Sequence, residues 1–208
     1  MSVVLEHWQT QVKTGHIATI LPDGCRDLIF KPTAGWFITD LAKTCEQVEL
    51  QPDDSYNGFR LRPGVQVDQA GLLASLSDDL TYDAILERLQ TYVTPATNVT
   101  EALSRLANGT ANVALAAADL GVQTRSLQRL LKQQTGRSPV FWLRLARVRR
   151  AARRLAHLPD LAELAYDMGY ADQAHMTREF RTWLGITPRR ISRDKGWLTQ
   201  HLGLGYGA

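Results

Sequence analysis

Short hydrophobic runs alternate with turn residues along the first third of the chain. The runs are rich in β-branched and aromatic residues, and sequences such as Pro22-Asp23-Gly24 and Pro63-Gly64 separate them. Short strands at this spacing are typical of a small sandwich or half-barrel, so we expect a small antiparallel β-domain over residues 1–70. Its strands are predicted at residues 3–5, 17–21, 28–30, 36–39, 47–50 and 58–61.

The hydrophobic period changes to that of a helix at about residue 72. Apolar residues between Leu80 and Val93 fall on one helical face, and a Thr-Pro pair at residues 94–95 ends the helix. The glycine-rich sequence 203–208 is expected to have little to pack against. The pattern predicts an α+β chain made of the β-domain, a linker helix region over 71–96, an all-α domain over 97–195 and a C-terminal tail over 196–208.

The first helix of the all-α domain has recognisable ends in the sequence. Asn98 and Glu101 have the spacing of a capping box, although Asn replaces the usual Ser or Thr. Asn108-Gly109 is typical of a helix C-terminus. We therefore expect this helix to begin at Asn98 and to end at Asn108.

The all-α part carries one pattern twice, over residues 113–140 and 161–189. Gly121 in the first copy corresponds to Gly169 in the second, 48 residues later. Two copies are too few for a solenoid, which needs about three or more units to bury a continuous core. The duplication therefore indicates a pair of small modules.

Each copy has the features of a helix-turn-helix. Ala117 and Ala165 are small enough for two helices to cross closely, and the two glycines suit the turn after the first helix. Thr124 and Asp172 are the expected N-caps of the second helices. The predicted inner faces are Leu120, Val122, Leu127, Leu130 and Leu131 in the first copy, and Met168, Tyr170, Met176, Phe180 and Leu184 in the second.

The outward faces of the second helices carry polar side chains at spacings of three and four residues. Because the second copy has one extra residue in its turn, we expect its stripe to be shifted by one position. Arg can bridge O6 and N7 of guanine, and Gln can bridge N6 and N7 of adenine, each with about 1–3 kcal/mol of base discrimination. A polar face that only contacts water is the alternative. The stripes are Arg125, Gln128, Arg129 and Lys132, and then Gln173, Ala174, Thr177, Arg178 and Arg181.

One helix is predicted between the copies, from Pro139, with Ser138 as its N-cap, to about residue 156. Such a helix spans roughly 27 Å, and neighbouring major grooves on one face of DNA lie roughly 34 Å apart. It could therefore hold two recognition helices in neighbouring grooves. Its core side is expected to be Trp142, Leu145, Val148 with Arg149, Ala152 and Leu155. Its other arginines, expected to contact phosphate or acidic side chains, are Arg144, Arg147, Arg150, Arg153 and Arg154.

The charge is unevenly divided along the chain. Residues 1–96 hold 7 Lys and Arg against 13 Asp and Glu, a net charge of −6. Residues 97–208 hold 17 against 8, a net charge of +9, and 15 of the 17 cations are Arg. The positive net charge of residues 97–208 favours a polyanionic partner, although a solvated basic surface explains the charge equally well.

The duplicated segment resembles the DNA-binding domain of AraC-type transcriptional regulators. The resemblance covers about residues 98–193 and is carried by Leu127-Gln128-Arg129-Leu130, by the sequence 169–180 and by Gly185-Ile-Thr-Pro188. It implies a seven-helix domain that binds double-stranded DNA sequence-specifically, commonly as a transcriptional activator.

The resemblance also implies which side chains contact DNA. Ala174 departs from a polar residue at its position, although its methyl group could touch a thymine methyl. The implied base-contacting residues are Arg125, Gln128 and Arg129, and then Gln173, Ala174, Thr177 and Arg178. We expect phosphate contacts from Lys132, Arg144, Arg150, Arg181, Arg189 and Arg190.

The N-terminal sequence 20–30 and the sequence 59–64 resemble an uncharacterised domain found ahead of such helix-turn-helix pairs. In related regulators this position holds an effector-binding or dimerising β-domain. A small-molecule effector and a second copy of the chain are therefore candidate partners, together with RNA polymerase.

Other chemistry is not expected from the sequence. Cys25 and Cys45 cannot form a four-cysteine zinc site, and no metal ligand set or cofactor motif is predicted. Cys25 is expected to be a small buried hydrophobe, and Asp23 to belong to a turn. The chain shows neither an apolar stretch of about 18 residues nor a secretory leader, so we expect a cytoplasmic protein without a membrane partner.

The main hypothesis is thus a transcriptional regulator that is not an enzyme. One alternative is a co-regulator or anti-activator that uses the same fold to bind other proteins. Another is an enzyme with a DNA-binding tail, whose turnover would depend on Asp23 or Cys25.

Overall fold

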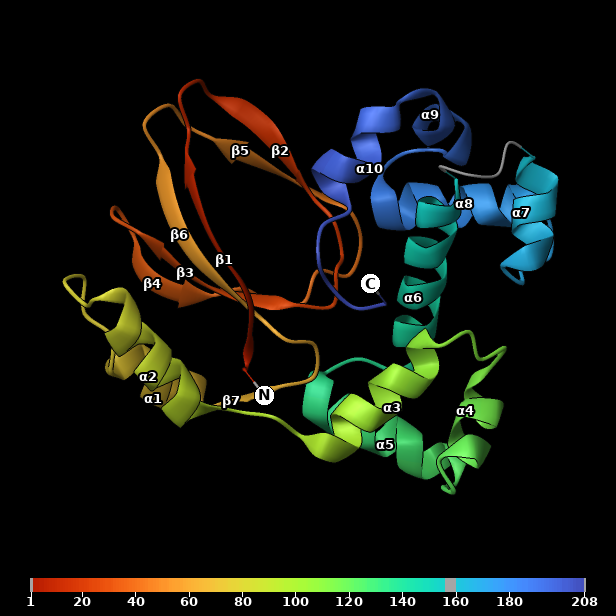
Figure 1. The fold of residues 1–208 in the computed structure, drawn as a ribbon, viewed down its shortest axis with the longest axis horizontal. Helices are drawn as coiled ribbons and strands as arrows, with labels where there is room; N and C mark the ends of the chain where they lie inside the picture. The colour runs from red at the N-terminus through yellow and green to blue at the C-terminus, as the bar shows by residue number, and fades with distance from the viewer. Residues whose placement is uncertain (1, 156–159, 208) are drawn as a thin grey trace.

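The computed structural model describes residues 2–155 and 160–207, and it has an N-terminal β-rich domain followed by a helical domain (Figure 1). The N-terminal domain is built on an antiparallel sheet with the strand order β1-β6-β3-β4. A separate antiparallel ribbon pairs two further strands, so that His16 faces Leu50 and Ile20 faces Glu46. The sheet strands are β1 (Val4–Gln11), β3 (Arg26–Lys31), β4 (Gly35–Ile38) and β6 (Ser55–Leu61), and the ribbon strands are β2 (His16–Ile20) and β5 (Glu46–Leu50).

The predicted strands are all confirmed, and β1 is much longer than the three residues expected. The sheet pairs Leu28 with Phe59, and both are fully buried. Because side chains alternate along a strand, the sheet has two different faces. Leu28 and Phe59 lie on one face with the core of this domain, and the other face looks toward the β2–β5 ribbon.

Two helices cover the first face of the sheet, and the second of them lies in the predicted linker helix region over 71–96. α1 (Gln69–Ala74) was not predicted, whereas α2 (Tyr82–Tyr92) was. Both helices complete the N-terminal core because their apolar side chains have no other surface to bury against. A short pair of strands, β7 (Gln66–Val67) and β8 (Val93–Thr94), closes this region. The helical side of the core consists of Leu72, Ile85, Leu89 and Val93, each at most 3% exposed.

The helical domain is organised around one long helix, α6 (Pro139–Arg154), which joins two groups of shorter helices (Figure 1). Ser138 caps α6 and Pro139 is its first residue, as predicted. Every side chain predicted for the core side of α6 is at most 5% exposed, including Arg149. The other helices are α3 (Thr97–Ala107), α4 (Val113–Asp119), α5 (Thr124–Thr135), α7 (Leu161–Asp167), α8 (Gln173–Leu184), α9 (Pro188–Arg193) and α10 (Lys195–His201).

The start of α3 differs from the prediction. The helix begins at Thr97 and its N-cap is Ala96, so no side chain of the described residues caps it. Asn98 lies inside the helix, where its side chain accepts a hydrogen bond only from the adjacent Val99 N–H. The capping box is therefore wrong because the helix starts earlier than the pattern suggests. The predicted end at Asn108 is confirmed.

The C-terminal segment corrects the expectation that it has little to pack against. Tyr206 is 4% exposed, and its ring meets the edge of Trp142 at a centroid distance of 4.9 Å. Its N–H donates to Asp23 O at 2.7 Å and its hydroxyl donates to Leu103 O at 2.9 Å. Figure 1 shows this segment between the β-rich domain and α6. One tyrosine thus anchors a glycine-rich segment that hydropathy alone leaves without structure.

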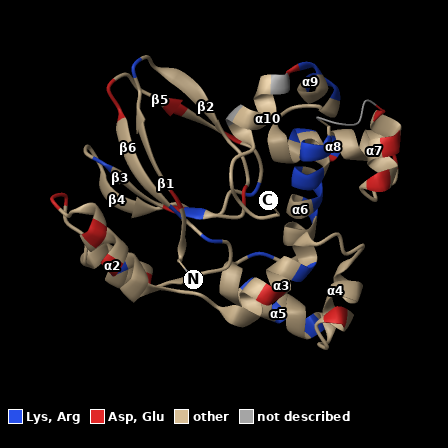
Figure 2. Cartoon of the chain, viewed as in Figure 1, with Lys and Arg blue, Asp and Glu red and all other residues tan. Residues whose placement is uncertain are grey.

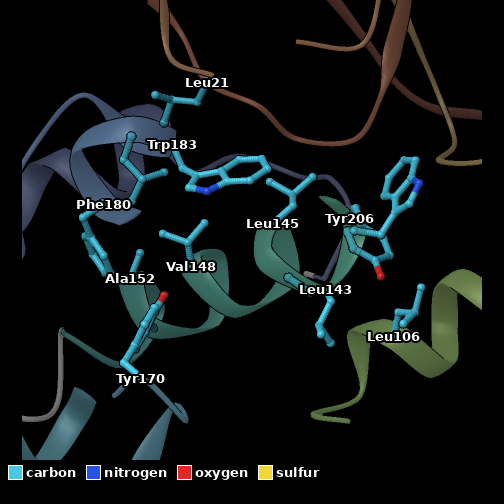
Figure 3. Close-up of a cluster of buried hydrophobic side chains, with 14 of the residues drawn as sticks. Leu21, Leu106, Leu143, Leu145, Val148, Ala152, Tyr170, Phe180, Trp183 and Tyr206 are labelled. Atoms are coloured by element: carbon cyan, nitrogen blue, oxygen red, sulfur yellow. The ribbon is translucent and has the colours of Figure 1, made fainter. Parts of the chain in front are cut away.

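The two domains share a continuous hydrophobic contact. Leu21 of the N-terminal domain belongs to the same buried cluster as Trp183 of α8 and Tyr206 (Figure 3). The two domains therefore share part of one buried core. No described helix has the length and apolar content needed to cross a membrane.

Candidate nucleic-acid interface

The first helix-turn-helix consists of α4 and α5. Gly121 adopts a left-handed conformation with φ of 65°, which lets the chain reverse direction after α4. Ala116 and Ala117 are buried where α4 approaches its neighbours, and Leu127 is buried beneath α5. The predicted module is confirmed in its outline, because small residues and a turn glycine sit where the helices meet.

Two details of this module differ from the sequence-based expectation. Thr124 is the first helical residue rather than the N-cap, and Gln123 precedes the helix with an extended backbone. Val122 is 43% exposed, whereas its counterpart Tyr170 is 5% exposed. Tyr170 is long enough to pack against α6, where the Arg147 guanidinium lies 5.5 Å from its ring centroid. The shorter Val122 therefore does not belong to the inner face.

The second helix-turn-helix consists of α7 and α8 and repeats the geometry. Gly169 has φ of 71°, and Asp172 caps α8 by accepting the His175 N–H. Four residues lie between α4 and α5, and five lie between α7 and α8. The predicted longer turn of the second module is thus present. Met176 and Phe180 are fully buried beneath α8.

The predicted base-contacting residues occupy the first two turns of α5 and α8. In helix-turn-helix proteins the N-terminal part of the recognition helix contacts base edges. Thr177 is half-buried, and its hydroxyl donates to Gln173 O at 2.9 Å. The exposed members of the set are Arg125, Gln128, Arg129, Gln173, Ala174 and Arg178.

The predicted phosphate contacts divide into two groups. Lys132, Arg181, Arg189 and Arg190 are exposed, although Lys132 also donates to Gly136 O at 3.2 Å. The remaining two, Arg144 and Arg150, already have partners within the protein. A cation that has a protein partner must give it up to contact a phosphate, which costs Arg144 and Arg150 more than it costs Arg181, Arg189 and Arg190.

Arg144 and Arg150 stabilise the helical domain in this structure. Arg144 donates to the Glu179 carboxylate, with its Nε 3.1 Å from Oε1, and this hydrogen bond raises the pKa of the guanidinium. Arg150 donates to Ala107 O at the end of α3, and burial lowers its pKa. The role of Glu179 escaped the sequence analysis. Its signal was a lone carboxylate between Arg178 and Arg181 in the sequence.

The positive charge follows the helices that carry these residues. Figure 2 shows Lys and Arg gathered along α6, α8 and α9, whereas acidic residues mark α7 and α2. Arg149 is the exception, because it is 1% exposed and faces the N-terminal domain. Burial lowers the pKa of Arg149 to about 10, which still leaves it charged at neutral pH.

The N-terminal domain touches the C-terminal ends of both recognition helices. Gln66 donates to Gln134 O in the last turn of α5 at 3.2 Å. Cys45 N–H donates to Thr182 O in α8 at 3.1 Å. Cys45 Sγ also lies against Gly185, where an added Cβ would come within 2.6 Å of it. These contacts leave the first turns of both helices, with the predicted base-contacting residues, outside the domain interface.

The fold and this surface define a double helix-turn-helix protein. Residues 98–194 match the family model described as a helix-turn-helix domain. Over 72 residues the chain is 36% identical to the HTH-type transcriptional activator RhaS of Escherichia fergusonii, covering 34% of this chain and 26% of that protein. RhaS of Klebsiella pneumoniae is 32% identical over 85 residues, covering 40% and 31%.

The chain is 26% identical to a transcriptional regulator of Chromobacterium violaceum whose structure is solved and which is described as containing an AraC-type DNA-binding domain. The match covers 46% of this chain and 89% of the Chromobacterium violaceum chain, with a TM-score of 0.43. The family match therefore spans both helix-turn-helix modules, α4–α5 and α7–α8, and is to a helix-turn-helix domain. The chain spans less than a third of the length of the curated relatives it matches.

Proposed function

We propose that this protein is a sequence-specific DNA-binding transcriptional regulator whose two recognition helices enter successive major grooves. The observation that carries the proposal is the repeated exposure of polar residues on the first two turns of α5 and α8. The matched helix-turn-helix family and the names of the curated relatives support the same function. The base-contacting residues are Arg125, Gln128, Arg129, Gln173, Ala174, Thr177 and Arg178.

Phosphate contacts supply the sequence-independent part of the affinity. Lys132, Arg181, Arg189 and Arg190 are exposed near the two recognition helices and carry this role. Arg144 and Arg150 contact phosphate only where DNA displaces their present partners within the protein. The protein acts in the cytoplasm without catalysing a reaction, and RNA polymerase and a second copy of the chain are its proposed protein partners.

Selection of bound sites from a random DNA pool tests this function. Two recognition helices in neighbouring grooves predict an enriched site with two short conserved blocks whose centres lie roughly 10 base pairs apart. Binding to that site should fall steeply between about 50 and 200 mM salt because counterions are released from DNA. Recovery of salt-stable protein partners without any enriched DNA would instead favour a protein-binding co-regulator.

A further inference from the structure

The β2–β5 ribbon stands away from the four-stranded sheet and leaves a cavity of about 690 Å³ between them. Ala18, Ile20, Val48 and Leu50 line it from the ribbon, and Ile20 and Val48 are 45% and 42% exposed. The inner faces of a β-sandwich normally interdigitate and bury such side chains. The volume lies within the range of small-molecule pockets, and the exposed apolar residues give the cavity an apolar wall.

The sheet contributes a preformed aromatic wall. Trp8, Phe37 and Tyr56 line the cavity from three different strands. Trp8 is held in place because its indole N–H donates to Asp27 at 3.1 Å. Its ring also covers Gly58, where an added Cβ would come within 2.2 Å of the indole. The wall therefore needs little rearrangement to receive the apolar part of a ligand.

The positive charges of the cavity are already neutralised or inaccessible. Arg60 forms ion pairs with Glu6, Asp23 and Asp27 at 3.2–3.4 Å. Arg149 is 1% exposed and donates to Gly203 O at 2.7 Å. Neither guanidinium is therefore free to bind an anionic ligand without displacing a partner.

The negative charges are in excess. Asp40 and Glu46 are exposed members of the cavity lining, and no ion pair involves either of them within residues 2–155 and 160–207. With Asp23 and Asp27, the lining holds four carboxylates against two guanidiniums. A cleft whose lining carries a net negative charge attracts cations, and aromatic faces add to the attraction of organic cations.

We propose that this cavity binds a small organic cation, an amine or quaternary ammonium group on an apolar body, and that its occupancy alters DNA binding. The second half of this inference rests on the proposed function, whereas the first half does not. The coupling follows from the cavity rim, which we define as Asp40, Leu41 and Ala42. These residues line the cavity and belong to the loop that leads to Cys45.

That loop contacts the region of both recognition helices. Leu41 O accepts from the Arg137 guanidinium directly after α5, and Cys45 N–H donates to Thr182 O in α8. Arg149 adds a third connection, because it lines the cavity from α6. A ligand that shifts the rim therefore acts on both helix-turn-helix modules at once.

Isothermal titration of the full chain with three matched probes tests the ligand class. Phenyltrimethylammonium, tert-butylbenzene and benzenesulfonate share one ring and a tetrahedral head that is positive, neutral or negative. We expect the cation to bind at least about tenfold more tightly than either of the others, which corresponds to a desolvated cation–π contact. Equal binding of the three, or preference for the anion, would overturn the proposal.

Paired substitutions on the ribbon test the location. Glu46→Gln removes a charge from the cavity side and should weaken cation binding about two- to fivefold. Glu49→Gln on the same strand is the control and should leave binding unchanged, because Glu49 pairs with Ile17 on the outer face. Ala18→Trp should abolish binding by filling the cavity, with Ile17→Trp as its control. If the two variants of each pair bound the cation equally well, the cation would bind elsewhere and the proposed site would be refuted.

The coupling is measured as the change in affinity for the selected DNA site when phenyltrimethylammonium is added. We expect a change in the wild-type protein that is largely lost in Arg137→Ala, which lacks the contact with Leu41 but retains the cavity. Cation binding without any change in DNA affinity would refute the coupling. Absence of any selected DNA site would refute the proposed function alone, because the titrations contain no DNA.

Discussion

Arg144 of α6 is paired with Glu179 of the second recognition helix, and the Glu179 side chain is only 5% exposed. Arg144 Nε lies 3.1 Å and 3.2 Å from the two carboxylate oxygens. Its guanidinium also lies 5.8 Å from the centroid of the Trp183 ring. The pair therefore fixes α8 against the helix that joins the two modules.

Arg144→Met should destabilise the protein by about 1–3 kcal/mol, because it leaves a buried carboxylate without its hydrogen-bonding partner. The double variant R144M/E179M should recover most of that loss, since it removes the stranded charge as well. Urea unfolding of the wild type, both single variants and the double variant measures the coupling. Additive losses would mean that the pair does not couple α6 to α8.

Arg129→Ala should weaken binding to the preferred DNA site by about 1–3 kcal/mol and relax the preference at one base position. The exposed Arg189 provides the comparison, because Arg189→Ala should weaken binding equally for all sequences and reduce the salt slope by about one. Binding titrations on the selected site and its single-base variants distinguish the two effects. An equal loss on every sequence for Arg129→Ala would exclude a base-contacting role.

Tyr206→Ala should destabilise the protein by about 3–5 kcal/mol, as expected for removal of a large buried aromatic side chain. Tyr206→Phe is the matched control, and it removes only the hydroxyl that donates to Leu103 O, at about 0.5–1.5 kcal/mol. Thermal or urea unfolding measures both. A neutral Tyr206→Ala would show that the C-terminal segment does not join the domains in solution.

Asp54 gives a pH dependence with a defined sign. Hydrogen bonds from the Lys31 ammonium, the Gln51 N–H and the Tyr56 hydroxyl lower the pKa of its carboxyl below 3.8. The folded state therefore binds this proton more weakly than the unfolded state, so the contribution of Asp54 is present above pH 3.8 and is lost as the pH falls through the lower folded pKa. Stability curves of the wild type and Asp54→Asn should converge at acidic pH. A constant difference down to pH 2 would contradict this assignment.

Much of the fold follows from local sequence patterns. The strands, α2 and the two helix-turn-helix modules were predicted because alternation, helical periodicity and turn glycines act within a few residues of each other. α1 escaped because its six residues are too short to show a period. The cap of α3 was misplaced because Asn98 and Glu101 fit a local pattern that the helix start at Thr97 overrides.

The candidate site was accessible from sequence only in part. A stripe at helical spacing identifies the outward residues of α5 and α8, since one face of each helix must be apolar to pack. A local pattern does not identify the partner of a charged side chain. Arg144 and Arg150 were both predicted to contact phosphate, yet Arg144 pairs with Glu179 and Arg150 donates to Ala107 O.

The sequence by itself determined the duplicated helix-turn-helix, the exposed stripes and the basic character of the second half, because each depends on neighbours along the chain. Only the tertiary structure decided that Tyr206 anchors the chain end, that Glu179 holds Arg144 and that a cavity lies between the β2–β5 ribbon and the sheet. Those features join residues far apart in sequence. Which distant side chains meet is set by how the elements pack, and local patterns carry no information about that.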